Sequence, residues 1–500
     1  MLDETHVRQE KLARLMEVGL NPYPNETQRD TACGEAVRNF DAWSVEQKQI
    51  TLGGRILTIR VHGGMMFADL ADESGKIQLA FKQDEIGNVL FEQFRDLIDP
   101  GDFVEATGVL FLTKRGEKSL QVGEWRPLAK ALLPLPEKWH GLKDVEARFR
   151  EREMDLISNP EVRHRFVVRS RVVTAFRKYL DERGFLEVET PILHPIPGGA
   201  NARPFATHHN ALDADFYLRI APELYLKRLV VGGFEKVYEI GRCFRNEGID
   251  HEHNPEFTML ELYQAYASKD VFVTFLEELL KTVTLSSVGS LTIEQEGGKT
   301  IDFDAPWKRT TFRDAIKEAC GIDIDTIKNE KDLLKAVKAK SVTVDFSDCH
   351  GMGEYFDALY KKTARPALVQ PTWVFDYPVD LKPLAAVSED DPTKSASVQL
   401  IVEGAEIMNA YYHELHDPSE QRKRLMDQQA LVAAGSSVAQ RIDEPFLSAL
   451  EHGMPPTSGM GIGIDRFVSV ITGAPSLKEV ILFPTLRPLS SVDETESVKS

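Results

Sequence analysis

Hydrophobic and polar residues form short runs near the N-terminus of the chain and follow longer mixed patterns beyond it. Among the first 20 residues, apolar side chains recur at near-helical spacing and Asn21-Pro22 ends the pattern, which predicts a short helix. From Ile50 to about Leu132 five β-type runs are separated by glycine and charged turns, namely GRILTIRV, MMFADLAD, KIQLAF, FVEATGVLF and SLQVGEW. Five strands at this spacing predict a small β-barrel of the oligonucleotide-binding (OB) kind, and another small barrel or sandwich fits the pattern equally well.

The second part of the chain begins after a stretch with two prolines. ALLPLPEKWH leaves the strand pattern near residue 140, and the chain then turns helical. We predict an amphipathic helix that ends at Gly184, β-rich segments over residues 216–264, 371–378 and 397–412, and a polar helical insertion over 420–450. The result is an α+β fold in four parts: a helical N-terminal extension (1–45), the barrel (46–140), a large domain (141–488) and a disordered acidic tail (489–500).

The composition disfavours several classes of protein. The first residues, MLDETHVRQEK, are charged, and no run approaches the roughly 18 apolar residues of a membrane span, so we expect a cytoplasmic protein without a membrane anchor. The four cysteines (Cys33, Cys243, Cys320 and Cys349) are far apart and form no CxxC pair, which predicts reduced thiols and neither disulfides nor a zinc site.

The formal net charge of −18 disfavours a protein that coats nucleic acid, because phosphate binding needs local positive charge. The charge is unevenly distributed, since residues 51–150 hold 14 Lys and Arg against 15 Asp and Glu. A nucleic-acid contact therefore fits the nearly neutral barrel better than the acidic remainder.

Three segments of the large domain carry glycine and carboxylate residues, and the second and third also carry arginine. They are GFLEVETPIL, then VYEIGRCFRNEGIDHEHNPEFTMLELYQAY, then GMGIGIDRFVSVITG. They resemble the three signature motifs of class II aminoacyl-tRNA synthetases, with FRNE and HNPEF as the most specific part. The resemblance covers roughly residues 45–488 and implies an anticodon-binding OB-fold barrel, followed by a catalytic domain built on an antiparallel β-sheet flanked by helices. The first segment, read as a helix and a strand that ends at Pro191, implies a homodimer.

The second and third segments imply an ATP site. In this family a carboxylate attacks the α-phosphorus of ATP, and an aligned guanidinium can stabilise the charge that builds on the phosphoryl oxygens. By resemblance Arg245 and Arg466 take this catalytic role. The residues expected to bind ATP are Arg245, Glu247, His253, Asn254, Phe257, Glu406, Gly461, Gly463 and Arg466. The GxGxGxDR pattern of the third segment, read as a glycine-rich turn before a helix, is not the dinucleotide fingerprint GxGxxG.

A metal site is expected on the hairpin SVQLIVEGAEIMNAYY, because Mg²⁺ that bridges ATP phosphates takes one or two carboxylates from a protein. A turn at the centre of this segment would bring Gln399, Ile401, Glu406 and Met408 to one face. Glu406 matches a Mg²⁺ ligand of the family, whereas Gln399 stands where the family has a second carboxylate. An amide oxygen coordinates more weakly, so the number of ions stays open.

The amino-acid pocket selects among the substrates of class II enzymes. A cationic side chain needs buried acceptors with negative charge, and RIAPELYLKRLVVGGF resembles the lysine-specific family, with Glu223 placed for the α-amino group. Aspartate- and asparagine-specific relatives carry a Gln-type residue at this position. The resemblance implies the lysine-binding residues Glu223, Glu261, Tyr263, Asn409, Tyr411 and Glu414, with Glu414 as the acceptor for the ε-ammonium. NAYYHEL is one residue longer than the family pattern, which leaves the register at Tyr411 and Tyr412 open.

Within the barrel, Arg60, Phe67, Gln78 and Glu117 fall at anticodon-binding positions of the family. An aromatic ring that stacks on an unpaired base, beside polar groups that read its edge, is expected for single-stranded RNA. A core aromatic is the equal alternative for Phe67. The resemblance thus implies an ATP-dependent lysine–tRNA ligase with Mg²⁺ as cofactor and tRNA(Lys), ATP, L-lysine and a second copy of the chain as partners.

Two other functions remain open from the sequence. The elongation factor P ligase, a paralogue, transfers a lysine-like group to a protein, but it lacks the barrel that the strand pattern predicts here. A non-catalytic RNA-binding or regulatory relative is disfavoured by Arg245, Glu247 and Arg466, whereas Gln399 and the extra residue near Tyr412 leave room for it. Pyrophosphate exchange that depends on lysine separates these three possibilities.

Overall fold

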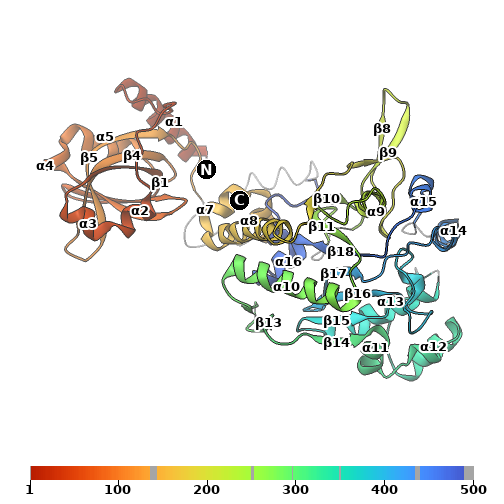
Figure 1. Ribbon diagram of the computed structural model, residues 1–500. Helices are drawn as coiled ribbons and strands as arrows, with labels where there is room; N and C mark the ends of the chain where they lie inside the picture. The colour runs from red at the N-terminus through yellow and green to blue at the C-terminus, as the bar shows by residue number, and fades with distance from the viewer. Residues whose placement is uncertain are drawn as a thin grey trace. The chain divides into compact units, whose positions relative to one another are not determined.

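The structure is a computed structural model, and it describes residues 2–135, 144–248, 253–295, 297–347, 349, 351–433 and 440–488. The chain forms two compact units, Met1–Leu142 and Lys143–Ser500 (Figure 1). The limits predicted for the barrel (46–140) and the large domain (141–488) remain predictions, and the predicted tail, residues 489–500, lies outside the described residues.

The first unit is built on a closed β-barrel with the strand order β1-β2-β3-β5-β4, which confirms the predicted OB-type barrel. Its strands are β1 (Gln49–His62), β2 (Met65–Asp72), β3 (Gly75–Lys82), β4 (Phe103–Leu112) and β5 (Lys118–Ala129). Along β2, Met66, Ala68 and Leu70 are buried in the barrel core, whereas Phe67 and Asp69 alternate with them and are only partly buried. Phe67 is therefore not a core aromatic.

The helices of the first unit lie around the barrel. They are α1 (Leu2–Glu17), α2 (Cys33–Arg38), α3 (Phe40–Val45), α4 (Gln83–Ile86) and α5 (Asn88–Leu97). The N-terminal helix α1 forms where the sequence pattern predicts it. Arg8 attaches α1 to the barrel unit, because its Nη1 donates to the backbone oxygens of Pro100 at 3.2 Å and Ala131 at 3.3 Å.

The second unit is built on an eight-stranded sheet with the order β14-β15-β16-β17-β18-β11-β10-β6. Its strands are β6 (Leu186–Glu187), β10 (Lys236–Phe244), β11 (Glu256–Ala265), β14 (Lys308–Thr311), β15 (Thr372–Phe375), β16 (Ser397–Val402), β17 (Ala405–Tyr411) and β18 (Thr457–Gly463). Neighbours are antiparallel except at the two edges, where β14 pairs with β15 and β10 with β6 in parallel. The predicted catalytic-domain fold, a largely antiparallel sheet flanked by helices, is confirmed. Smaller sheets are formed by β7 (Leu193–His194), β8 (Ala206–His209) and β9 (Ala214–Leu218), and by β12 (Thr292–Glu294) and β13 (Thr300–Asp302).

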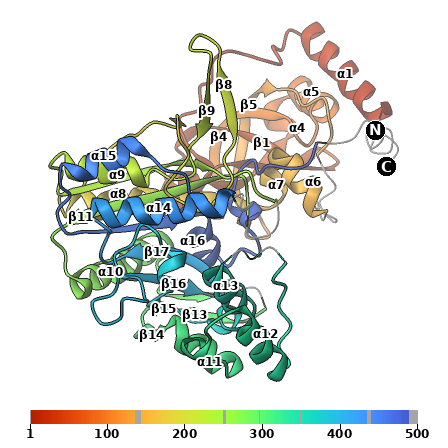
Figure 2. The same ribbon diagram turned by 90° about the vertical axis from the view of Figure 1, so that its right-hand side faces the viewer.

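The second unit also contains α-helices and short 3₁₀ helices. They are α6 (Val145–Arg150), α7 (Arg152–Ser158), α8 (Pro160–Asp181), α9 (Glu223–Val231), α10 (Lys269–Val288), α11 (Phe312–Cys320), α12 (Glu330–Ala339), α13 (Met352–Thr363), α14 (Pro418–Ala433), α15 (Glu444–Glu451) and α16 (Ile464–Ile471), with the 3₁₀ helices η1 (Ile324–Thr326), η2 (Arg365–Ala367), η3 (Val379–Leu381) and η4 (Leu477–Val480). The apolar sides of α8, α10 and α16 form the main core with one face of the sheet. Helices α11, α12 and α13 form a second core at the β14 end (Figure 2).

The structure corrects the sequence-based expectation in two segments near the first and second motifs. The segment 216–264, expected to be β-rich, contains helix α9, which starts directly after Pro222. Its residues ELYLKRLVV are mostly strong helix formers, and the short apolar run did not distinguish helix from strand. The strand after Gly184 comprises only Leu186–Glu187 and does not extend to Pro191.

Two further corrections concern the strands of the third motif and of the metal hairpin. The glycine-rich segment before α16 is strand β18, not a turn. On the hairpin, a bulge between Leu400 and Ile401 sets Met408 opposite Leu400, and both belong to the main core. Met408 therefore does not share a face with Gln399 and Glu406, because a bulge shifts the alternation of side chains by one residue.

None of the helices in the described part of the chain combines the length and the apolar character that crossing a membrane requires. None of the four cysteines forms a disulfide within the described residues, and Cys33 and Cys243 are buried.

Candidate active site

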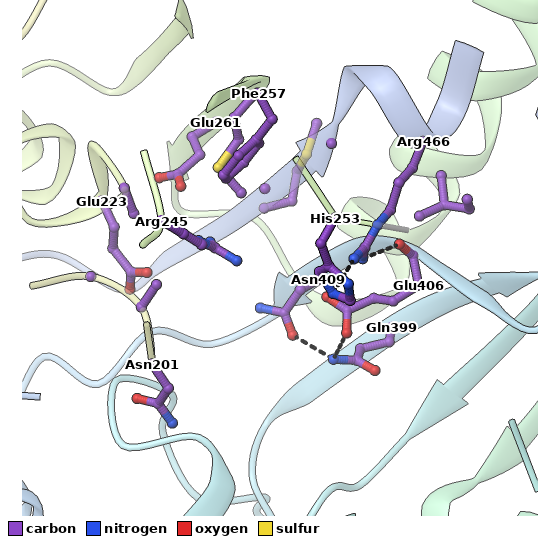
Figure 3. A pocket seen from close by; sticks show the side chains of 18 of the residues that line it. Asn201, Glu223, Arg245, His253, Phe257, Glu261, Gln399, Glu406, Asn409 and Arg466 are labelled. Atoms are coloured by element: carbon purple, nitrogen blue, oxygen red, sulfur yellow. Dashed lines mark hydrogen bonds between the residues drawn. The ribbon is translucent and has the colours of Figure 1, made fainter. Parts of the chain in front are cut away.

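A cavity of about 400 Å³ lies on the sheet face opposite to the main core (Figure 3). Alternation along the strands divides the two faces: on β11, Leu260 and Leu262 enter the core, whereas Glu261 and Tyr263 line the cavity. Cross-strand pairing continues the cavity face across the sheet, since Gln399 pairs with Asn409, Asn409 with Gly461, and Gly461 with Glu261. Side chains far apart in the sequence thus form one continuous floor.

Glycine at alternate positions of β18 keeps this floor open. A Cβ atom at Gly459 would lie 2.3 Å from Tyr263 Cε1 and 2.5 Å from Glu414 Oε1. At Gly461 the nearest atom would be Met259 Cε at 3.1 Å, and at Gly463 it would be Arg466 Cβ at 3.9 Å. The sequence analysis named Gly461 and Gly463 but missed Gly459, the position where a side chain is least tolerated.

Buried carboxylates gather at one end of the cavity, which we call the acidic end: Glu223, Glu261 and Glu414 (Figure 3 shows the first two). The fully buried Lys227 lies between two of them, with its Nζ 2.7 Å from Glu223 Oε1 and 2.6 Å from Glu414 Oε2. Glu261 Oε2 and Glu414 Oε1 have no hydrogen-bond partner among the residues that the structure describes. Because buried acceptors are almost always paired, these two oxygens indicate a donor that comes from outside the chain.

The charges at the acidic end are strongly coupled. Burial raises the pKa of Glu414 to about 8, while Lys227 acts in the opposite direction. Burial, and then the charge of Glu223, raise the pKa of Glu261. Burial alone would lower the pKa of Lys227, but Glu223 and Glu414 raise it. Lys227 pairs with Glu223 and Glu414, whereas the charges of Arg245 and Arg219 lower the pKa of Glu261 without outweighing its burial.

The extra residue in NAYYHEL is absorbed by a bulge, which fixes the register that the sequence left open. Tyr411 pairs with Gly459 and lines the cavity. The backbone N–H groups of Tyr412 and His413 both donate to Ala396 O, at 3.0 and 3.4 Å. Tyr412 is buried in the core, and the side chain of Glu414 returns to the cavity.

The other end of the cavity carries guanidinium and ammonium groups and is called here the basic end. Arg466, at the start of α16, donates from Nη1 to Glu406 O at 3.1 Å, and its Nη2 lies 3.4 Å from His253 Nε2 (Figure 3). Arg245 lies between the two ends, beside Glu261 and with its Cζ 5.0 Å from the centre of the Phe257 ring (Figure 3). Lys361 and Arg365 line the same cavity. Such a set of cations suits a polyanion.

A hydrogen-bonded polar cluster lies at the basic end and consists of Glu406, Gln399, Asn409, Tyr377 and Lys382. Gln399 Nε2 donates to Glu406 Oε2 at 3.0 Å and to Asn409 Oδ1 at 3.2 Å (Figure 3). Gln399 Oε1 accepts from the hydroxyl of Tyr377 at 2.6 Å, and Lys382 Nζ donates to Asn409 Oδ1 at 2.7 Å. The amide oxygen of Gln399 therefore faces away from Glu406.

The electrostatics of Glu406 follow from the same surroundings. Burial would raise the pKa of Glu406, but the charges of Lys382, Arg466, Lys361 and Arg365 lower it. Within the described residues no group of three or more His, Cys, Asp or Glu side chains could hold a metal ion. A carboxylate and an amide nitrogen do not fit an ion shared between Glu406 and Gln399, because Mg²⁺ requires oxygen ligands.

The cavity brings together all the residues of the large domain that the sequence analysis selected. They are Glu223, Arg245, Glu247, His253, Asn254, Phe257, Glu261, Tyr263, Gln399, Glu406, Asn409, Tyr411, Glu414, Gly461, Gly463 and Arg466. Residues 249–252 of the second motif lie outside the described residues. Asn254 also has a structural contact, because its Oδ1 accepts from the backbone N–H of Thr485 at 3.1 Å.

Sequence reasoning missed Lys227, Lys361, Arg365, Lys382 and Gly459 in or next to the cavity. Lys227 carried a usable signal, since it follows Glu223 by four residues on a helix and such pairs meet. The other three cations stand outside any motif, and only the fold brings them to the cavity.

On the barrel, the four predicted anticodon residues lie on neighbouring strands and one loop. Arg60 pairs across the sheet with Phe67, and Asp69 pairs with Gln78. Arg60 is also ion-paired with Asp69 at 3.1 Å. Gln78 Oε1 accepts from Ser119 Oγ at 3.0 Å, and Glu117 is exposed between β4 and β5. An outward aromatic among polar groups suits an unpaired base.

Comparisons with known proteins agree for both units. The family described as "tRNA synthetases class II (D, K and N)" matches residues 144–487, and "OB-fold nucleic acid binding domain" matches residues 50–128. A lysine–tRNA ligase of Syntrophomonas wolfei is 50% identical over 485 residues, which is 97% of each chain. Ligases of the same name from Moorella thermoacetica (49% identical) and Roseiflexus castenholzii (50% identical) match over 96% of this chain and 97% of their own length.

Proposed function

The chain belongs to the class II tRNA synthetases of the D, K and N group, and on this premise we propose that it is an ATP-dependent lysine–tRNA ligase. It activates L-lysine to lysyl-adenylate and then transfers lysine to the 3′ end of tRNA(Lys). The observation that carries the choice of lysine is the acidic end of the cavity, where Glu261 Oε2 and Glu414 Oε1 are buried without a hydrogen-bond partner among the described residues. An aspartate or asparagine substrate has no cation on its side chain to offer these carboxylates.

In the first step the carboxylate of lysine attacks the α-phosphorus of ATP, a new O–P bond forms, and pyrophosphate leaves. Arg245 and Arg466 stabilise the negative charge on the phosphoryl oxygens, and Phe257 stacks on the adenine. Glu247, His253 and Asn254 contact the nucleotide, while Gly461 and Gly463 leave space for the adenosine. Mg²⁺ bound with ATP would neutralise phosphate charge, and Glu406 would be the carboxylate that holds it. Alignment and charge neutralisation supply the rate without a nucleophilic side chain.

Lysine binds in the acidic end with its ε-ammonium on Glu414 and its α-amino group on Glu223. Tyr263, Asn409 and Tyr411 line the space between the two ends, and Glu261 adds a further acceptor. Lys227 keeps Glu223 and Glu414 in position, at 2.7 and 2.6 Å, before the substrate arrives. The ammonium then replaces water at oxygens that already have a fixed direction, which lowers the cost of ordering the site.

In the second step a hydroxyl at the 3′ end of tRNA attacks the carbonyl carbon of lysyl-adenylate, and AMP leaves with the C–O electron pair. The barrel holds the anticodon through Arg60, Phe67, Gln78 and Glu117. The partly exposed, outward position of Phe67 supports this role. The reaction takes place in the cytoplasm.

The enzyme acts as a homodimer through its first motif. Leu186, Ile192 and Leu193 of this motif have exposed fractions of 47%, 45% and 44%, and apolar exposure of this kind suits an interface. Light scattering at micromolar concentration should give about twice the 56.3 kDa of one chain. A stable monomer would contradict this part of the proposal.

ATP–pyrophosphate exchange and tRNA charging test the function together. We expect exchange that depends on lysine, and lysine attached to tRNA(Lys) transcript when tRNA is added. Lysine-dependent exchange with transfer to a protein and not to tRNA would favour a ligase of the elongation factor P type. Absence of exchange with any amino acid would favour a non-catalytic RNA-binding relative.

A further inference from the structure

We propose that the ammonium group of Lys382 takes the place of a metal ion held by the protein beside Glu406, so that the reaction uses only the Mg²⁺ that accompanies ATP. The inference rests on the proposed function, because it concerns the ATP used to activate lysine. It assigns a role to a residue that lies outside the three motifs.

The first argument is the direction of the Gln399 side chain. Its Nε2 faces two acceptors, Glu406 Oε2 at 3.0 Å and Asn409 Oδ1 at 3.2 Å, and its Oε1 accepts from the Tyr377 hydroxyl at 2.6 Å. The opposite orientation would set an amide oxygen against a carboxylate oxygen and a second amide oxygen, with no hydrogen between them. Gln399 therefore supplies a donor to Glu406 where an ion shared by the two side chains would require an oxygen.

The second argument is the position of Lys382. Its Nζ donates to Asn409 Oδ1 at 2.7 Å and lies 4.9 Å from the centre of the Tyr377 ring. Asn409 Oδ1 thus accepts from both Lys382 and Gln399, so a single oxygen connects the ammonium to the amide that holds Glu406. The backbone is fixed at this point, because Lys382 N donates to Val379 O at 3.0 Å and Pro383 O accepts from Gln421 Nε2 at 3.2 Å.

The third argument is charge. The basic end is lined by Lys361, Arg365 and Arg466 in addition to Lys382, and the charges of all four lower the pKa of Glu406. A metal ion bound at Glu406 without phosphate ligands would be repelled by these cations. The described residues contain no cluster of three metal-ligating side chains that would compensate for this repulsion.

The number of bound metal ions tests the proposal directly, with Mn²⁺ as the probe and its electron paramagnetic resonance signal as the readout. The full-length protein should bind no Mn²⁺ in the cavity without nucleotide, and only the Mn²⁺ that accompanies the nucleotide when lysine and α,β-methylene-ATP are present. The double variant Lys382→Met/Gln399→Glu has a carboxylate pair without the ammonium, and it should bind one Mn²⁺ more per site. Lys423→Met, an exposed lysine on α14, is the matched control and should not change the count.

Equal counts in the parent and the double variant would overturn the proposal, as would Mn²⁺ bound in the parent cavity without nucleotide. Thermal unfolding of each variant shows whether it has folded. If the double variant does not fold, the single variants Lys382→Met and Lys382→Arg decide the question through the Mg²⁺ dependence of pyrophosphate exchange at fixed ATP. Lys382→Met should need at least about tenfold more free Mg²⁺ for half-maximal exchange, because a missing positive charge must then be supplied by an ion, and Lys382→Arg should resemble the parent. An unchanged Mg²⁺ requirement in Lys382→Met would contradict the inference.

Failure of the proposed function has a different signature. It would appear as absence of lysine-dependent exchange in the parent protein, whereas the Mn²⁺ count without nucleotide does not depend on which amino acid the enzyme uses.

Discussion

The acidic and basic ends of the cavity are built on neighbouring strands of one sheet, but their buried carboxylates differ in the hydrogen-bond donors that the protein supplies. At the acidic end, Glu261 Oε2 and Glu414 Oε1 have no partner among the described residues. At the basic end, Gln399 donates to both Glu406 and Asn409, so the carboxylate there has a partner within the protein. The comparison indicates that the acidic end awaits a cation from its ligand, whereas the basic end is already organised for an anion.

The same comparison explains how one cavity can bind lysine and ATP side by side, because the residues that match the charge of each substrate lie at different ends. The cation of the substrate is matched by carboxylates on α9, β11 and the segment after β17, and the phosphates are matched by cations on α13, η2 and α16 and by Lys382, directly after η3. Glycines on β18 separate the two groups without adding side chains. A substitution at the acidic end should therefore change the binding of lysine and leave the binding of ATP nearly unaffected. A substitution at the basic end should do the reverse.

The largest effect is expected for Arg245→Ala, between the two ends. Loss of a guanidinium aligned with the phosphoryl oxygens should slow adenylate formation by about 10²-fold or more, or about 3 kcal/mol, by analogy with the loss of an oxyanion donor. Pyrophosphate exchange measures this loss. Arg242→Ala, at an exposed arginine of β10 that lies 3.6 Å from Glu256, should retain exchange and serves as the control. Near-normal exchange in the Arg245 variant would refute the assignment.

The variants Gly459→Ala and Gly463→Ala should distinguish the lysine-binding role of the acidic end from the ATP-binding role of the basic end. The added methyl group at 459 would lie 2.5 Å from Glu414 Oε1, so we expect a loss of lysine affinity worth about 1–3 kcal/mol, measured as KM for lysine. At 463 the nearest atom is 3.9 Å away, and the methyl group points into the space proposed for ATP, so KM for ATP should rise instead. The comparison fails if both variants change the same KM.

Phe67→Ala tests the role of the barrel, and this substitution should affect neither end of the cavity. Loss of one stacked base typically costs about 1–3 kcal/mol, so KM for tRNA should rise by roughly 5-fold to 100-fold while pyrophosphate exchange without tRNA stays unchanged. Leu112→Ala, another exposed apolar side chain of the barrel unit, is the control. Equal effects of the two substitutions on tRNA would argue against a stacking role.

The pH dependence gives the smallest effect and concerns the acidic end alone. Because the pKa of Glu414 is raised to about 8 in the empty cavity, binding of the lysine ammonium must release a proton at lower pH. The affinity for lysine should therefore rise with pH up to about 8, by at most about tenfold per unit, while lysine itself stays charged. Calorimetry in buffers of different ionisation enthalpy measures the released proton. Binding without proton release at pH 7 would contradict the raised pKa.

Motifs with strong local patterns were predictable, and contacts set by the register were not. Strand alternation gave the five barrel strands, and the motif residues Arg245, Phe257 and Arg466 do line one cavity. The bulge at Leu400/Ile401 could not be predicted from the hairpin sequence. A slip of one residue turns every later side chain to the other face of the sheet, so the predicted face was wrong for Met408. Lys382 lies outside the motifs. Its role depends on an acceptor, Asn409, that lies 27 residues away in the chain, so the local sequence around Lys382 did not indicate it.

The most direct test of the account is the discrimination between lysine and norleucine, its analogue without the ε-ammonium, by the parent and by Glu414→Gln. The parent should prefer lysine by about 10⁴-fold or more in kcat/KM, because norleucine leaves buried carboxylates unpaired. Glu414→Gln keeps the shape of the cavity but removes the charge, so kcat/KM for lysine should fall steeply, the preference should collapse, and KM for ATP should stay the same. Glu389→Gln, at an exposed carboxylate, is the control and should behave like the parent. If Glu414→Gln used lysine as well as the parent does, Glu414 would not be the acceptor, and the choice of lysine would rest on Glu223 and Glu261 alone.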